Sequence, residues 1–374
     1  MTSDRERRIT TVNVEARSGD GTRAVTSDGF DALVASVRAN CRLSDARHAR
    51  NMTMCTYLLE MREQYRWEQG IALDAALSRA DVGAWLSERE AQWDAIEHDD
   101  YLRLPSDDAL VDPFAATTIN GALVPRGWVY GAGVGRFGKP QFFLAELERE
   151  EWRDGARVLV AGREQARDLA PAPAALRADT IYVRRDALRR LLWERAGLWT
   201  HRRSGGAFGA ALDAAGFADD PMQALERMTD VEIETLILHE LGERVAGAAL
   251  SPAWERMLGG FTRRKAELFA RAARDHLADC TVTLPALLAR GASTSLHLWF
   301  AGLDGLRGEL FPRARDAYDL WRRGDGGSAL AAASAAGAVH WKRVCDTTLA
   351  LAGVGETDAE RAIEALASAA ATRL

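Results

Sequence analysis

Apolar side chains recur at helical spacing from residue 28 to about residue 98. The pattern begins with "FDALVASVRANC" and continues, after a cap expected at Ser44 or Asp45, through "ARHARNMTMCTYLLEMREQYRWEQG". Gly70 is expected to end this second helix, and "ADVGAWLSEREAQWDAIE" follows as a third. The spacing therefore predicts a helical N-terminal region over residues 28–104.

The pattern changes between residues 105 and 203. Glycine-rich turns separate short β-branched and aromatic runs, and Asp154-Gly155 between "EWR" and "ARVLV" is typical of a hairpin turn. We expect a small antiparallel sheet here, followed by the helix "DALRRLLWERAGLW".

Helical spacing returns over residues 204–374. Breaks are expected at five places: Ser251-Pro252, Gly259-Gly260, Pro285, Gly291 and residues 324–327. Residues 1–27 are polar and aperiodic, which predicts a disordered tail. The fold class is thus α+β and mostly α-helical, with a helical N-terminal region, a small antiparallel sheet in the middle and a C-terminal helical domain.

Composition narrows the class of protein. The chain has 374 residues, of which 47% are hydrophobic and 27% charged, as in globular proteins. Its apolar runs are too short for a membrane span, and its first 25 residues lack the apolar segment of a secretory signal, so we expect a cytoplasmic protein without a membrane partner. A net charge of −6 argues against nucleic acid, whereas a second copy or another protein remains open as partner.

The cysteines and one glycine-rich loop carry little chemistry. Four cysteines are scattered without a C-x-x-C pair, which indicates neither a disulfide framework nor a cysteine-rich zinc site. Residues 133–140, "GVGRFGKP", match the outline of a phosphate-binding loop, but Pro140 stands where that loop needs Ser or Thr. We expect a hairpin turn instead, with Arg136 and Lys139 free to meet an anion at its tip.

The stretch "ILHELGERVAG" carries the first candidate chemistry. On a helix expected from Asp230 to Ala249, with Thr229 as its cap, His239 and Glu243 share one face. Such an i, i+4 pair can hold one metal ion, and Glu240 beside it would act as the general base, in the manner of H-E-x-x-H helices. The simpler alternative is a solvated polar face, opposite the core stripe of that helix.

A second helix, "FARAARDHLADCTVTLPALL", supplies the candidate partners. His276 falls near the centre of its apolar arc and Asp279 at the edge. A buried histidine needs a hydrogen-bond partner, which is the structural interpretation. The functional one joins His276 and Asp279 to His239 and Glu243. His239, Glu243 and His276 would be ligands of zinc, iron or manganese, and Asp279 would be a further ligand or would orient one of them. A plain hairpin at Pro252 would carry residue 276 roughly 20 Å past residue 239, so the Gly259-Gly260 break must redirect the chain.

Three other features remain open. His297 and His340 lie among apolar neighbours, which favours structural roles. In the N-terminal region, Met54, Leu58, Met61 and Tyr65 are expected to form a buried arc that includes Arg62, paired with a carboxylate or receiving an anion.

Four phrases, taken in order, resemble a family of bacterial proteins of unknown function: "CRLSDARHARNMTMCTYLLEMREQYRWEQG", "GRFGKPQFFL", "ILHELGE" and "RDHLADC". The resemblance spans about residues 28–345 and implies no catalytic roles. The leading hypothesis from the residues is a metal-binding helical site with hydrolytic or oxidative activity. The alternative is a non-catalytic binding or assembly protein, in which the HELGE face meets solvent and the N-terminal Met/Tyr/Trp helix docks a partner.

Overall fold

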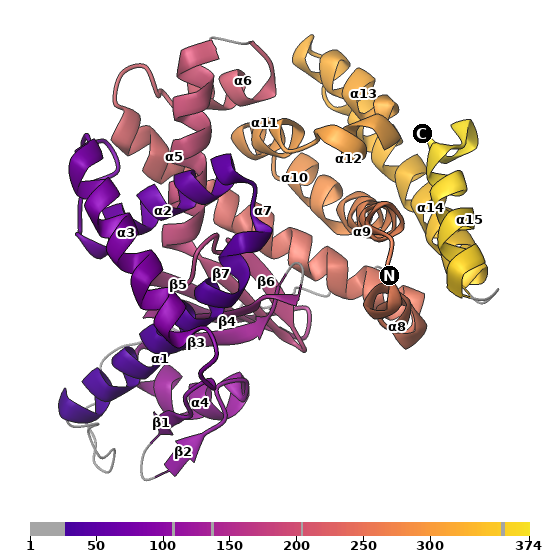
Figure 1. Ribbon diagram of the computed structural model, residues 1–374. Helices are drawn as coiled ribbons and strands as arrows, with labels where there is room; N and C mark the ends of the chain where they lie inside the picture. Colours follow the sequence, from indigo (N-terminus) through magenta and orange to yellow (C-terminus); the bar gives the residue numbers. More distant parts are fainter. Residues whose placement is uncertain (1–26, 107–108, 136–137, 203–204, 353–355) are drawn as a thin grey trace, which may run out of the picture. The chain divides into compact units, whose positions relative to one another are not determined.

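The computed structural model describes residues 27–106, 109–135, 138–202, 205–352 and 356–374 (Figure 1). The protein is a mostly helical α+β protein, with its strands in the middle of the chain and helices towards both ends, as the sequence predicts. The tail expected over residues 1–27 lies outside the described residues except for Ser27, where α1 begins. The chain divides into two compact units, which are described separately.

Unit 1 contains the residues up to Gly70 together with residues 76–153 and 164–170. Its elements are α1 (Ser27–His48), a 3-10 turn (Ala49–Asn51), α2 (Met54–Glu68), α3 (Arg79–Ile96), β1 (Leu104–Ser106), β2 (Ala109–Val111), α4 (Ala116–Leu123), a 3-10 turn (Val124–Arg126), β3 (Trp128–Val134) and β4 (Pro140–Arg153). The hairpin expected around residues 133–140 is confirmed, because β3 pairs antiparallel with β4. A core of α1, α4, β3 and β4 side chains holds this unit together.

The second helix of unit 1 does not begin where the sequence suggested. Ser44 and Asp45 lie inside α1 and are buried, since the Ser44 hydroxyl donates to the Pro140 carbonyl and Asp45 pairs with Lys139. The N-cap of α2 is Thr53, whose side chain accepts from the Thr56 amide. Ser44 and Asp45, which resemble a helix cap in the sequence, instead form buried polar contacts in the core of unit 1.

Unit 2 begins with residues 71–75 and 154–163 and continues from Pro171 to the C-terminus. The strand β5 (Ala156–Arg167) contributes its first part to this unit and its last four residues to unit 1. Asp154 and Gly155 both adopt positive φ, 47° and 82°, as a two-residue type I′ turn requires.

The strands of unit 2 are not all antiparallel. Residues 157–161 of β5 pair parallel with β7 (Thr180–Arg184), which pairs antiparallel with β6 (Ala174–Arg177). The parallel pair was not predicted, because nothing in the alternation of apolar residues distinguishes it from a hairpin.

Helices form the remainder of unit 2. They are α5 (Arg185–Arg202), α6 (Ala207–Ala214), α7 (Pro221–Leu250), α8 (Pro252–Gly260), α9 (Arg264–Ala278), a π-helical turn (Asp279–Thr283), α10 (Leu284–Ala289), α11 (Ser293–Ala301), α12 (Gly305–Leu310), α13 (Pro312–Arg322), α14 (Ser328–Ala352), α15 (Glu356–Ser368) and a 3-10 turn (Ala370–Thr372). Within this unit α9 packs against both α7 and α14, in the orange part of the chain (Figure 1).

Two predicted boundaries in this unit are wrong. The helix α7 begins at Pro221 rather than near Asp230, because Asp220 caps it through the Gln223 amide and Pro221 fits its first turn. Pro285 does not break the helix, since it occupies the first turn of α10 directly after the π-helical turn. The breaks at Pro252, Gly260 and Gly291 are confirmed. None of the helices that the structure describes is long and apolar enough to cross a membrane.

Candidate metal centre

The face of α7 that carries His239 and Glu243 is largely covered. Their side chains are 22% and 19% exposed, and Glu240 is buried. On the opposite stripe of the helix, Ile237 and Leu241 are buried, whereas Val245 is exposed. The polar face of "HELGE" therefore faces another element of unit 2 rather than open solvent.

That element is α9 together with the π-helical turn. α7 approaches it closely at Gly242, where an added Cβ would lie 2.6 Å from the Ala278 carbonyl oxygen. A glycine is required at this crossing because any side chain would displace the backbone of the π-helical region. This close approach places His239 level with residues 275–279. The chain changes direction at α8, between α7 and α9, and α8 ends at the expected Gly259-Gly260 break.

One imidazole and two carboxylates converge at this crossing. Donor atoms of His239, Glu243 and Asp275 all lie within 4.8 Å of one another. Ligand atoms about 2.0–2.2 Å from one zinc ion lie at most about 4.4 Å apart, so small side-chain adjustments would allow these three to hold one ion. The donor set, one imidazole with two carboxylates, suits zinc, iron or manganese.

Asp279 holds the imidazole from the other side. His239 Nδ1 donates to Asp279 Oδ1 over 2.8 Å, and the second oxygen of Asp279 accepts from Arg307 over 2.6 Å. The Nε2 atom of His239 is thereby directed towards Glu243, at 3.6 Å from its Oε1. A carboxylate that fixes the tautomer and direction of a ligating imidazole is the usual partner of a metal-bound histidine.

The charges of the cluster shift several pKa values. Burial alone would lower the pKa of His239, but the charge and hydrogen bond of Asp279 raise it well above its ordinary value. Burial would raise the pKa of Glu243, yet the hydrogen bond with His239 and the charge of Arg274 hold it at about 2. Burial raises the pKa of Asp275. Without a metal, then, His239 carries a proton between ionised Asp279 and Glu243.

Arg274 competes for one of the ligands. Its guanidinium donates to Glu243 Oε1 over 2.9 Å and lies 3.3 Å from Glu255. An incoming ion must share the Glu243 carboxylate with this arginine or displace it towards Glu255. The arginine therefore balances the negative charge when no cation is present.

Glu240 lies beside the cluster without joining it. Its carboxylate accepts a hydrogen bond from the Leu176 backbone in β6. Burial, reinforced by the charge of Glu243, raises the pKa of Glu240 to about 7. Such a carboxyl group can exchange a proton at neutral pH, which is the property that a general base needs.

His276 lies apart from the three converging donors. It is fully buried, stacks on Trp341 with a ring separation of 4.6 Å, and its Nε2 contacts the Arg307 carbonyl oxygen at 3.0 Å. Burial lowers the pKa of His276 to about 3. His276 therefore has the surroundings of a core histidine that is hydrogen-bonded to a backbone carbonyl, which was the structural alternative considered from the sequence.

Asp275 and Arg307 were not predicted from the sequence as members of this cluster. Asp275 lies four residues before Asp279, so "DHLAD" repeats on α9 the i, i+4 spacing of His239 and Glu243 on α7. That spacing was a usable signal, but the central position of His276 in the apolar arc drew attention away from it. Arg307 lies in α12, and no local pattern connects it with Asp279.

The remaining predicted polar residues have other surroundings. Lys139, expected to meet an anion, is buried in unit 1 between Asp45 and Asp168, with Nζ–O distances of 2.7 and 3.3 Å; Arg136 lies outside the described residues. On α2 the buried arc is wrong, because Met54 and Leu58 are exposed and Arg62 is 49% exposed beside Glu63.

The other two histidines have partners of their own. His297 Nδ1 lies 2.7 Å from the Tyr318 hydroxyl, and His340 Nε2 lies 2.8 Å from the Thr372 carbonyl oxygen. Three of the four cysteines, Cys41, Cys280 and Cys345, are buried, and all four are free thiols.

The fold and this cluster define a class of protein: a mostly helical α+β chain whose second unit buries a His/carboxylate group between two helices. Comparison with known families places it more closely. Residues 32–184 match the model of the N-terminal domain of a family of unknown function (DUF6866), and residues 189–370 match the model of its C-terminal domain. The chain belongs to this family. No curated protein and no solved structure matches it.

Proposed function

We propose that the protein binds one divalent transition-metal ion through His239, Glu243 and Asp275. The observation that carries this proposal is the convergence of these three donors within 4.8 Å from two helices. Asp279 supports it as the residue that directs the imidazole. Asp279 is thus assigned a positioning role, and Asp275 replaces His276 among the proposed ligands.

The number of ligands favours chemistry over a purely structural role. Three protein ligands leave a coordination position for water or a substrate, as in catalytic zinc sites, whereas structural zinc sites have four protein ligands. We extend the proposal to hydrolytic or oxidative activity at that position, with Glu240 as the general base. The bound metal would polarise a substrate or activate water.

Metal analysis of tag-free protein tests the proposal. After chelation and reloading with zinc, manganese or, without oxygen, ferrous iron, the wild-type chain should retain about one ion, a stoichiometry set by one three-donor site. His239→Ala and Asp275→Asn should lose the ion. Asp279→Asn should keep it with an affinity about 10- to 100-fold lower. The matched control is His98→Ala, since that side chain is 93% exposed.

The variant His276→Gln distinguishes the two ligand sets. If folded by circular dichroism, it should retain the metal, because His276 lies apart from the converging donors. Folded wild-type protein that binds no ion, or His239→Ala that binds it as wild type does, would contradict the proposal.

A non-catalytic binding protein is the second candidate. It is favoured by Met54, Leu58 and Leu59, which form an exposed apolar strip on α2 with exposed fractions of 70%, 47% and 54%. The other half of that hypothesis, a solvated HELGE face, does not agree with the burial of His239 and Glu243. Metal-free folded protein in the experiment above would make this candidate the better one.

A further inference from the structure

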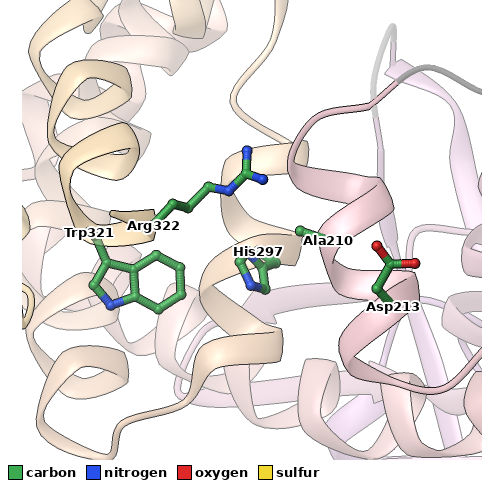
Figure 2. Close-up of a pocket in the computed structure, with 5 residues that line it drawn as sticks. All are labelled: Ala210, Asp213, His297, Trp321 and Arg322. Carbon is green, nitrogen blue, oxygen red and sulfur yellow. The ribbon is translucent and has the colours of Figure 1, made fainter. Parts of the chain in front are cut away.

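A pocket of about 460 Å³ lies in unit 2. None of the residues that line it belongs to the His239 cluster. Its lining comes from three helices: Ala210 and Asp213 on α6, His297 on α11, and Trp321 and Arg322 at the end of α13. Figure 2 shows α13 facing α6, with the His297 ring between Trp321 and Asp213. A volume of this order is within the range of small-molecule sites, about 300–1,000 Å³.

The floor of the pocket is aromatic and held in place. The ring of His297 lies 5.0 Å from that of Trp321. Its Nδ1 is engaged by the Tyr318 hydroxyl at 2.7 Å, which leaves Nε2 as the nitrogen available to a ligand. Burial, followed by the charge of Arg322, lowers the pKa of His297, so the ring is neutral at pH 7. A neutral, oriented imidazole beside an indole forms a surface for a planar apolar group.

Opposite charges flank this floor. Arg322 and Asp213 are exposed, and neither side chain has an ion-pair partner among the residues that the structure describes. Among the described residues, the Arg322 guanidinium lies over the face of the Tyr318 ring, 5.8 Å from its centroid. One cation and one anion, both at the pocket and not paired, suit a ligand that carries both charges.

We propose that this pocket binds a small zwitterion with a planar apolar side group, of which an aromatic α-amino acid is the simplest example. Arg322 would receive the carboxylate, Asp213 the ammonium, and the Trp321 and His297 rings the planar group. The site is independent of the proposed metal centre, because the two share no residue.

Calorimetric titration with three probes tests each part of this assignment. L-phenylalanine carries both charges, phenylacetate lacks the ammonium and phenethylamine lacks the carboxylate. We expect L-phenylalanine to bind with the highest affinity. Because exposed ion pairs contribute little, each missing charge should weaken binding by only about three- to fivefold.

Variants then assign each charge to its residue. Arg322→Gln should weaken L-phenylalanine and phenylacetate by the same factor and leave phenethylamine unchanged, and Asp213→Asn should do the reverse. Arg323→Gln, the exposed neighbour of Arg322 outside the lining, is the matched control. The proposal fails if L-phenylalanine shows no saturable binding, or if both variants bind all three probes as the control does. The metal content of these variants should equal that of wild type.

Discussion

Two regions of the molecule bury charged side chains, and they do so in different ways. In unit 1, Lys139 Nζ is surrounded by Asp45, Asp168 and the Leu169 carbonyl, at distances from 2.7 to 3.3 Å, and the lysine is 9% exposed. In unit 2, the His239 cluster keeps three donor atoms close together, and the side chains of His239 and Glu243 are each about a fifth exposed. The first arrangement contains a lysine as its cation, whereas the second joins one histidine to several carboxylates and is partly exposed to solvent.

The two regions differ in what balances their negative charge. Around Lys139 burial would lower the pKa of the lysine, but Asp45 and Asp168 raise it, so the ammonium persists as the internal counter-ion. Burial raises the pKa of Asp45 to about 6. Around His239 a proton and Arg274 supply the positive charge, and under the proposed function a metal ion would replace them. Each of the following predictions tests one side of this contrast.

The largest effect is expected from Lys139→Met. Removing the cation breaks the buried ion pairs of Lys139 with Asp45 and Asp168, which costs about 3–5 kcal/mol in the free energy of unfolding. Urea denaturation measures it. The control Lys342→Met breaks an exposed pair with Asp346 and should cost less than about 0.5 kcal/mol. Equal, small losses in both variants would mean that the Lys139 cluster is not a structural pair.

Gly242→Ala tests the crossing that assembles the other region. The new methyl group would meet the Ala278 carbonyl at 2.6 Å, so the two helices must separate, at a cost of about 1–3 kcal/mol. Metal retention should fall with stability, because His239 moves away from Asp275. Gly247→Ala, on the same helix with open space around it, should instead stabilise by up to about 1 kcal/mol. A Gly242→Ala protein as stable as Gly247→Ala would contradict the role of this contact.

The last effect depends on pH and concerns Glu232, which lies on α7 within the electrostatic influence of His239 and Asp279. Burial raises its pKa to about 8, and its Oε2 has no hydrogen-bond partner among the described residues. Because the folded-state pKa exceeds the ordinary value of 4.5, the protonated group stabilises the fold below that value, and this contribution is lost as the pH rises towards 8.

Glu232→Gln should therefore lose less stability than wild type between pH 5 and pH 8. Chemical denaturation at several pH values measures the difference. The control is Glu234→Gln, two residues further along, whose side chain is partly exposed near Arg290. If Glu232→Gln and wild type follow the same pH profile, the burial of an uncharged carboxyl group at this position is wrong.

The sequence predicted the helices and strands better than the tertiary contacts between them. Helical spacing and the glycine-rich turn at residues 133–140 are local signals, and the helices and the β3–β4 hairpin followed from them. The i, i+4 spacing that places His239 and Glu243 on one face of α7 is a local signal of the same kind. Asp275 was missed, and His276 was placed among the ligands, because the side of α9 that meets α7 depends on the close contact at Gly242, a tertiary fact without a local signature.

Lys139 illustrates the same limit in unit 1. Its position in a glycine-rich turn suggested an exposed tip, and Ser44 and Asp45 resembled a helix cap. Both interpretations were wrong because residues far apart in the chain, Asp45, Lys139 and Asp168, satisfy one another in the interior. Such pairing follows from the topology of α1 and the hairpin, which periodicity alone does not determine.

The π-helical turn at Asp279–Thr283 gives one continuous helical segment two angular phases. A π turn closes its hydrogen bonds over five residues instead of four, so the faces before and after it are rotated relative to an unbroken α-helix. Asp275 and Asp279 can then face α7, while Leu284 and Leu287 beyond the turn still reach the helical core. Shortening this turn by one residue would bring the two halves into a single phase. Either the acidic side chains would then turn away from α7, or Leu284 and Leu287 would leave the core.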